Sequence, residues 1–165
     1  EIEFFVTFTE INTDHVIFPY EMNFTVTCDS PYGYTPEFTH SITSSSTLTK
    51  THVINNTSDC HEDYIYPLIK ISPKSHGTIT IQNVTDNNGT MKIDALKNDN
   101  FYIDCQHLKI YDTTNSIISF ESLGVKDTDN IYWPRLAYGE NILKFTGDAT
   151  FEIIYREPRK VGAFA

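Results

Sequence analysis

The stretch WPRLAYGENILKFTGDATFEIIYRE, residues 133–157, decides the fold. Apolar and polar residues alternate on both sides of the letters TGDA, which is typical of strands with one buried face. The residues on the apolar face are Leu143, Phe145, Phe151, Ile153 and Tyr155. Gly147 and Asp148 can adopt the backbone angles of a tight turn, so the sequence predicts a two-stranded β-hairpin here.

The same period of two recurs along the chain, between turn sequences such as DNNG, KNDN and YDTTN. The strand candidates are residues 2–8, 24–28, 47–54, 64–71, 77–84, 90–96, 101–106, 107–112, 116–121, 141–145 and 150–156. Short strands at this spacing, without helical periodicity, predict an all-β fold, an antiparallel β-sandwich or barrel. Residues 127–140 lack strand punctuation and predict a long loop that crosses the sheet, in which Trp133 is an apolar plug.

The composition of the chain argues against a nucleic-acid partner and against membrane insertion. The 165 residues include 12 Lys and Arg against 22 Asp and Glu, a net charge of -10, which repels phosphate backbones and anionic lipid surfaces. No run approaches the length of apolar residues that a membrane span requires. These features indicate a folded protein without a nucleic-acid partner and without membrane insertion.

The pattern of strands and turns divides the chain into three predicted segments. Residues 1–22 are interpreted as a strand and a connection from a preceding domain that the sequence does not include, because Glu1 already lies within a strand-like run. Residues 23–157 are predicted to form the β-sandwich. Residues 158–165, which begin with a proline and have no pattern of their own, are predicted to be a C-terminal tail.

Metal and enzyme chemistry find little support in the motifs, and no cofactor is expected. CHED, at Cys60–Asp63, lacks a second ligand pair, so a solvated loop is favoured over a zinc site. DTDN, at Asp127–Asn130, lacks the glycine and the glutamate of a calcium loop. Most acidic residues lie in turns, and the six histidines form no defensible catalytic arrangement, so the protein is predicted not to be an enzyme.

Three cysteines cannot all pair within one chain, which favours a reducing compartment. Five N-x-S/T sequons keep open the alternative of a secreted or viral surface glycoprotein. The odd cysteine count and the absence of a signal segment weigh against that alternative.

Four segments, in this order, resemble the C-terminal domain of distal tail proteins from long-tailed, non-contractile bacteriophages and related prophages. The segments are FTVTCDSPYGY (24–34), YPLIKISPKSHGTITIQNVTDNNGTMKIDAL (66–96), NDNFYIDCQHLKIYD (98–112) and the stretch 133–157. The last of these is similar to the family ending through Trp133, Leu136, Gly139, Asn141, Ile142, Phe145, Gly147, Ile153, Tyr155 and Arg156.

The resemblance implies a galectin-like sandwich of the jelly-roll type in the virion tail tip or baseplate, made in the cytoplasm of the bacterial host. In that family the domain projects outward from a hexameric ring that links the tail tube to host-facing and receptor-binding proteins. A full-length parent would then be a homo-hexamer, and this segment alone a monomer.

A galectin-like fold also suggests a second function, carbohydrate binding to host cell-wall glycans during adsorption. Trp133 and Tyr138 are the candidates to stack on a sugar ring, with Glu140 and Asn141 as hydroxyl partners. The polar cluster of true galectins is not found at matching spacings. The alternative for the two aromatic residues is packing in the core and loops, and for Glu140 and Asn141 it is shaping the turn after Gly139.

Overall fold

The computed structural model describes residues 1–14, 21–28, 30–125 and 131–160. Two compact units divide the chain. The first consists of Glu1–Pro36 together with the segment from Pro158, and the second is Glu37–Glu157. No helix in the described ranges is long and apolar enough to cross a membrane.

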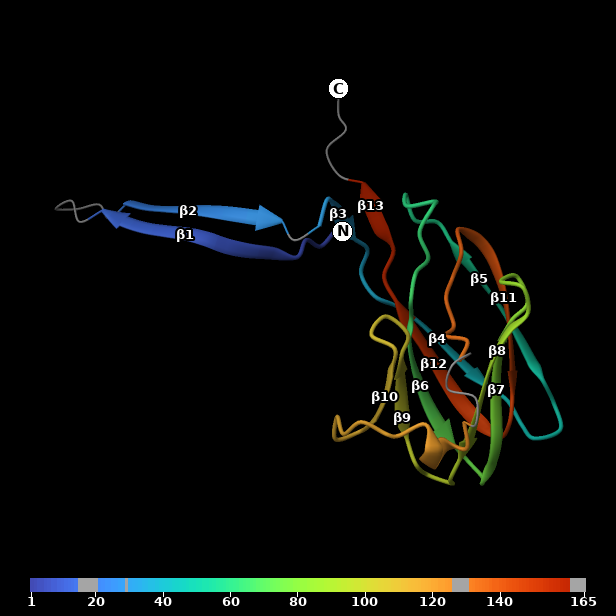
Figure 1. Cartoon of the computed structure of the whole chain (residues 1–165). Helices are drawn as coiled ribbons and strands as arrows, with labels where there is room; N and C mark the ends of the chain where they lie inside the picture. The colour runs from blue at the N-terminus through green and yellow to red at the C-terminus, as the bar shows by residue number, and fades with distance from the viewer. Residues whose placement is uncertain (15–20, 29, 126–130, 161–165) are drawn as a thin grey trace. The chain divides into compact units, whose positions relative to one another are not determined.

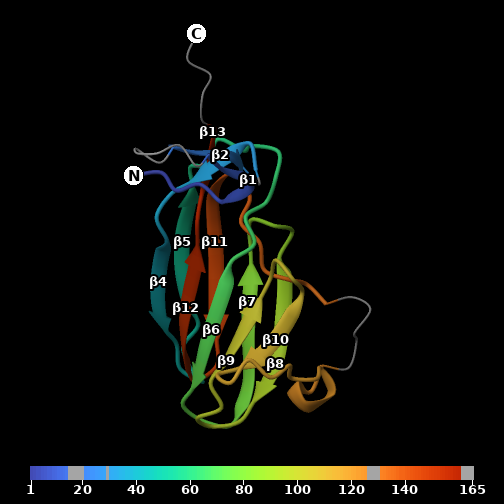
Figure 2. The same cartoon turned by 90° about the vertical axis from the view of Figure 1, so that its left-hand side faces the viewer.

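The second unit is a sandwich of two antiparallel sheets (Figures 1 and 2), which confirms the predicted all-β sandwich. The five-stranded sheet has the order β10 (Lys109–Asp112), β9 (Phe101–Asp104), β6 (Leu68–Pro73), β12 (Ala149–Tyr155) and β4 (Phe38–Thr43). The four-stranded sheet has the order β5 (Lys50–Asn56), β11 (Gly139–Thr146), β7 (Gly77–Asn83) and β8 (Gly89–Ala95).

The core lies between these two sheets. Burial alternates along β6, β7, β8, β11 and β12, because every second side chain of a strand points to the same face. The largest fully buried side chains are Phe101, Phe145, Phe151, Ile54, Ile69, Ile71, Ile81, Ile103, Ile110, Leu136, Leu143 and Ile153. Both sheets contribute to this set, so the apolar faces predicted from the alternation are the faces that meet.

The predicted hairpin at the end of the sandwich is wrong in its pairing. Its two strands do not bond to each other: β11 pairs with β5 and β7, whereas β12 pairs with β4 and β6. The segment between them is an arch from one sheet to the other. Its two large aromatic residues, Phe145 and Phe151, face each other across the core with ring centroids 4.8 Å apart.

Gly147 makes this arch possible. Its φ of 107° lies in the region that side chains disfavour, and an added β-carbon would lie 2.9 Å from the carbonyl oxygen of Thr78. The arch therefore passes directly against β7. Glycine is the residue that both the backbone angle and the close approach require.

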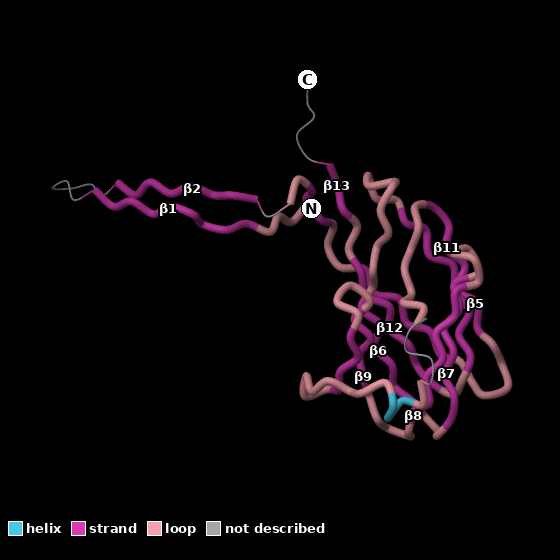
Figure 3. Tube along the Cα trace, in the orientation of Figure 1, coloured by secondary structure: helices cyan, strands magenta, loops and turns pink. Residues whose placement is uncertain are grey.

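The predicted strand at residues 116–121 is also wrong. Ile117 forms only an isolated bridge with Tyr111 and is 67% exposed. The Asp112 carboxylate accepts hydrogen bonds from the backbone N–H groups of Thr114 and Ser116, which turns the chain away from the sheet edge. A short 3-10 helix, η1 (Glu121–Leu123), follows and is the helix in Figure 3.

The first unit contains two separate strand pairs. β1 (Val6–Asp14) pairs with β2 (Glu21–Cys28), and β3 (Tyr32–Tyr34) pairs with β13 (Pro158–Lys160). The predicted sandwich range of 23–157 and the observed unit of Glu37–Glu157 share their C-terminal limit. They differ at the N-terminal limit because β2 joins β1 rather than either sheet of the sandwich. The segment predicted as a tail begins with β13.

No disulfide joins any two of Cys28, Cys60 and Cys105. Cys28 is exposed, whereas Cys60 and Cys105 are buried. Burial raises the pKa of the Cys105 thiol, which keeps this side chain protonated and apolar in character.

Candidate functional site

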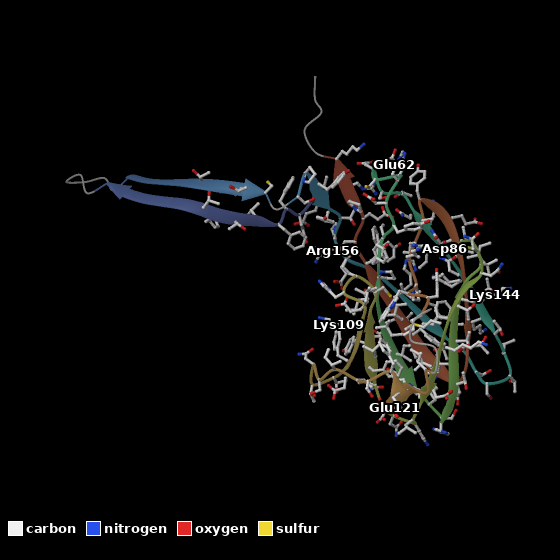
Figure 4. The ribbon with its side chains drawn as sticks, viewed as in Figure 1. Glu62, Asp86, Lys109, Glu121, Lys144 and Arg156 are labelled. Atoms are coloured by element: carbon white, nitrogen blue, oxygen red, sulfur yellow. The ribbon has the colours of Figure 1, made fainter. Side chains whose placement is uncertain are left out.

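Three loops gather at one end of the sandwich, residues 57–67, 84–88 and 131–138, and we call this region the loop end. It forms because β5 and β7 end there while β6, β8 and β11 begin there. Figure 4 shows Glu62 and Asp86 at this end, with Glu121 at the opposite end. All four predicted site residues lie in or directly after the last of these loops.

Backbone groups anchor that last loop on the sandwich. Leu136 and Ile65 exchange two backbone hydrogen bonds of 2.9 and 2.8 Å. The side-chain amide of Asn83 donates to the carbonyl of Arg135 at 2.7 Å, and the amide of Asn56 donates to the carbonyl of Ala137 at 3.1 Å. The loop is therefore a fixed part of the sandwich surface.

A buried carboxylate secures the loop as well. Arg135 Nε donates to Asp86 Oδ2 at 2.7 Å, and the hydroxyl of Tyr132 donates to the same oxygen at 2.9 Å. The hydrogen bond from Arg135 lowers the pKa of Asp86 against the opposing effect of burial, with a further contribution from Tyr132. Asp86 therefore stays ionised in the fold.

Arg135 also presents a face to solvent. Its guanidinium lies 4.0 Å from the ring centroid of Tyr64, a cation–π contact. Tyr64 is exposed. Arginine and tyrosine are enriched at protein interfaces, so this pair is a candidate contact surface.

Trp133 packs inward. It is half-buried against the core cluster, and its ring meets Phe120 edge-to-face with centroids 6.0 Å apart. This geometry agrees with the packing alternative for Trp133. Whether it also contacts a glycan or a partner stays a prediction.

The side-chain amide of Asn141 forms hydrogen bonds to the backbone of the turn before β11. Its side chain accepts from the N–H of Ala137 at 2.9 Å and donates to the carbonyls of Ala137 and Gly139 at 2.8 and 2.9 Å. Its exposed fraction is 0%. The amide thus shapes the turn at Gly139, as the structural alternative predicts.

Tyr138 and Glu140 face outward. Tyr138 is 50% exposed, and its ring lies 3.9 Å from that of His61. Glu140 is exposed on β11, opposite Asn55 on β5. The structure therefore divides the four predicted residues into an inward pair, Trp133 and Asn141, and an outward pair.

Two contacts at this end are absent from the sequence interpretation, Arg135 with Asp86 and Arg135 with Tyr64. Asp86 is one of the acidic residues that the sequence places in turns, and no local spacing connects it to a residue 49 positions later. No pattern in the sequence links Arg135 to either partner.

The metal motifs give no cluster. Cys60 Sγ donates to Asp63 Oδ2 at 3.0 Å. Across residues 1–14, 21–28, 30–125 and 131–160, no group of three or more His, Cys, Asp or Glu side chains could hold a metal ion. DTDN, from Asp127, falls outside the described residues.

Comparison with known proteins identifies the family. No curated protein sequence matches the chain. One similar solved structure is the crystal structure of SPP1 Dit (gp 19.1), titled as a paradigm of the hub adsorption apparatus in phages that infect Gram-positive bacteria. The TM-score is 0.64 at 15% identity, which shows a common fold; the match covers 95% of this chain and 60% of that chain.

A family model described as a phage tail C-terminal domain matches residues 32–155. The match takes in both sheets of the sandwich and the loop end. Since it covers most of the sequence, the chain belongs to the family of phage tail C-terminal domains.

Proposed function

We propose that this chain is the outward-projecting C-terminal domain of a distal tail protein, part of the hub that links the tail tube to host-recognition proteins. Membership of a phage tail family makes it a structural component of the tail. The observation that carries the finer proposal is the fold shared with SPP1 Dit over 95% of this chain.

The proposed role is mechanical and not catalytic. At the loop end, polar side chains such as Asn141 and Asp86 are engaged with the protein's own backbone and side chains. The outward residues, Tyr64, Arg135 and Tyr138, have the composition of a protein contact surface. We assign the contact with neighbouring tail proteins to this surface.

Immunogold electron microscopy of virions tests the location. Antibodies against the sandwich should label the tail tip, and label confined to the head or spread along the tail shaft would contradict the proposal. The assembly is tested by native mass spectrometry of a distal tail chain that carries this domain with its ring-building half. We expect a hexamer, whereas a monomer at micromolar concentration would overturn the hub assignment.

Glycan binding is the second candidate, and the exposed ring of Tyr138 favours it because sugar rings stack on exposed aromatic faces. Calorimetric titration with host cell-wall polysaccharide should then show saturable binding that Tyr138→Ala abolishes without loss of stability. The matched comparison is Trp133→Ala, which removes a half-buried ring and should lower stability. If no polysaccharide gives a heat of binding, glycan binding is contradicted and only the structural role remains.

A further inference from the structure

Two histidines face each other between the sheets at one edge of the sandwich. His40 lies on β4, the edge strand of the five-stranded sheet, and His52 lies on β5, the edge strand of the four-stranded sheet. The distance from His52 Nε2 to His40 Nδ1 is 3.0 Å. This contact spans two strands that share no backbone pairing.

Both histidines occupy inward positions. His40 lies opposite the buried Ile153 of β12, and His52 lies opposite the buried Leu143 of β11. Both rings are half-buried, so each keeps partial access to solvent. The pair therefore closes the space between the sheets where an apolar side chain would otherwise be expected.

The separation of the two nitrogens matches a chelating pair. Two imidazole nitrogens bound to one metal ion at about 2.0 to 2.1 Å, with angles between about 90° and 110°, lie about 2.8 to 3.4 Å apart. We propose that His40 and His52 form a two-histidine site for a borderline divalent transition ion, namely Cu²⁺, Ni²⁺ or Zn²⁺. Solvent supplies the remaining ligands, since no third His, Cys, Asp or Glu joins the pair among the described residues.

Tyr155 orients the imidazole ring of His40 by a hydrogen bond and by ring stacking. The Tyr155 hydroxyl lies 3.4 Å from His40 Nε2, and its ring stacks on the imidazole with centroids 5.8 Å apart. When Nε2 carries the proton and donates to the hydroxyl, Nδ1 of His40 keeps its lone pair free to bind a metal. A hydrogen-bond partner on the far nitrogen is the usual arrangement behind a metal-bound histidine.

His52 needs one internal rearrangement. In the ion-free pair the N–H at Nε2 of His52 can donate a hydrogen bond to His40 Nδ1. When a metal binds, His52 changes tautomer: its proton then sits on Nδ1 of His52, which leaves Nε2 of His52 free to bind the ion. No proton is released when both rings are neutral.

The expected ion preference and pH dependence follow from imidazole chemistry. Imidazole suits Ni²⁺, Cu²⁺ and Zn²⁺ and not Mg²⁺ or Ca²⁺. Binding weakens as the pH falls through the histidine range, because protonation removes the lone pair. The titratable group that β12 places against the pair is Tyr155, whose pKa burial raises to about 12, so it stays neutral throughout.

Thermal unfolding of the protein with added Ni²⁺ or Zn²⁺ at about pH 7.5 tests the proposal. Above saturation, Tm should rise by roughly 3 to 5 °C for each tenfold increase in free metal, and Mg²⁺ should have no effect. Electron paramagnetic resonance with Cu²⁺ gives an independent readout, since two bound nitrogens produce a characteristic splitting. No Tm shift with either Ni²⁺ or Zn²⁺, or a Cu²⁺ spectrum without nitrogen splitting, would overturn the proposal.

Variants locate the site. His40→Asn and His52→Gln each keep a hydrogen-bonding group near the lost nitrogen but remove an imidazole ligand, so either should abolish the Ni²⁺-dependent shift. His76→Gln changes an exposed histidine elsewhere and should leave the shift intact. If a His40 or His52 variant is too unstable to compare, nitrogen NMR of the unaltered protein should show Zn²⁺ perturbing those two rings. Binding that persists in both variants would place the ion elsewhere and contradict the assignment.

Discussion

Arg135 Nε lies 2.7 Å from Asp86 Oδ2, and this contact joins the loop before β11 to the turn between β7 and β8. Asp86 has a side-chain exposure of 6%, so its charge depends on protein partners rather than on water. This buried carboxylate therefore helps to hold the loop before β11, together with the two backbone hydrogen bonds between Leu136 and Ile65.

Replacing Arg135 with glutamine should lower the free energy of unfolding by about 2 kcal/mol, because a buried charge then keeps only the Tyr132 hydroxyl as a strong donor. Urea denaturation followed by tryptophan fluorescence measures the loss. Lys144→Gln removes an exposed cation on β11 and should cost less than about 0.5 kcal/mol. Equal effects in the two variants would contradict the role given to Arg135.

The same carboxylate predicts a pH dependence. The pKa of Asp86 is lower in the folded state than in the unfolded chain, so its contribution is fully present above the unfolded pKa, about 3.9. The contribution is lost as the pH falls through the folded pKa. Stability should therefore fall less steeply below about pH 4 in Asp86→Asn than in the unaltered protein. Parallel curves from denaturation at a series of pH values would argue against this linkage.

Asn141→Ala should destabilise the domain by about 2 to 4 kcal/mol, since the N–H of Ala137 and two carbonyls lose their buried partner at once. The neighbouring Glu140→Ala serves as the control because its side chain is exposed, and it should change stability by less than about 0.5 kcal/mol. Chemical denaturation of both variants checks the difference. A small effect of Asn141→Ala would mean that water replaces the amide.

Gly89→Ala tests the packing of the loop on β8. An added β-carbon would overlap the Tyr132 ring, so the loop must shift, and we expect a loss of about 1 to 3 kcal/mol. In a Tyr132→Ala background the obstacle is gone and the same substitution should cost less. A double-mutant cycle measures this coupling. Additive effects would show that the glycine is needed for another reason.

Local patterns in the sequence predicted which side chains are buried, but not which strands pair. Phe145 and Phe151 alternate with polar neighbours, and alternation depends only on the pleat of each strand. Whether the two strands bond to each other depends on residues far along the chain. The short turn between them therefore predicts a hairpin, whereas the structure has an arch. The strand predicted at 116–121 failed for a similar reason, since apolar residues alone do not provide a partner edge.

In the candidate site, too, local contacts could be predicted from the sequence and long-range contacts could not. The hydrogen bonds of the Asn141 side chain join it to backbone groups no more than four residues away. The sequence could therefore predict that Asn141 shapes the turn after Gly139. The contacts of Arg135 with Asp86 and of His40 with His52 join elements that only the tertiary fold brings together. Residue type and spacing therefore carried no signal for either pair.

The position of β11 and β12 inside their sheets affects how the protein can be made. β11 lies between β5 and β7, and β12 lies between β4 and β6, yet both follow every other strand of the sandwich in the chain. While a ribosome is still adding residues before Gly139, each nascent sheet has a gap at its middle with two open edges facing it. The sandwich can close only after the last strands emerge from the exit tunnel, so chains stalled or cleaved before that point should aggregate rather than fold into a shortened domain.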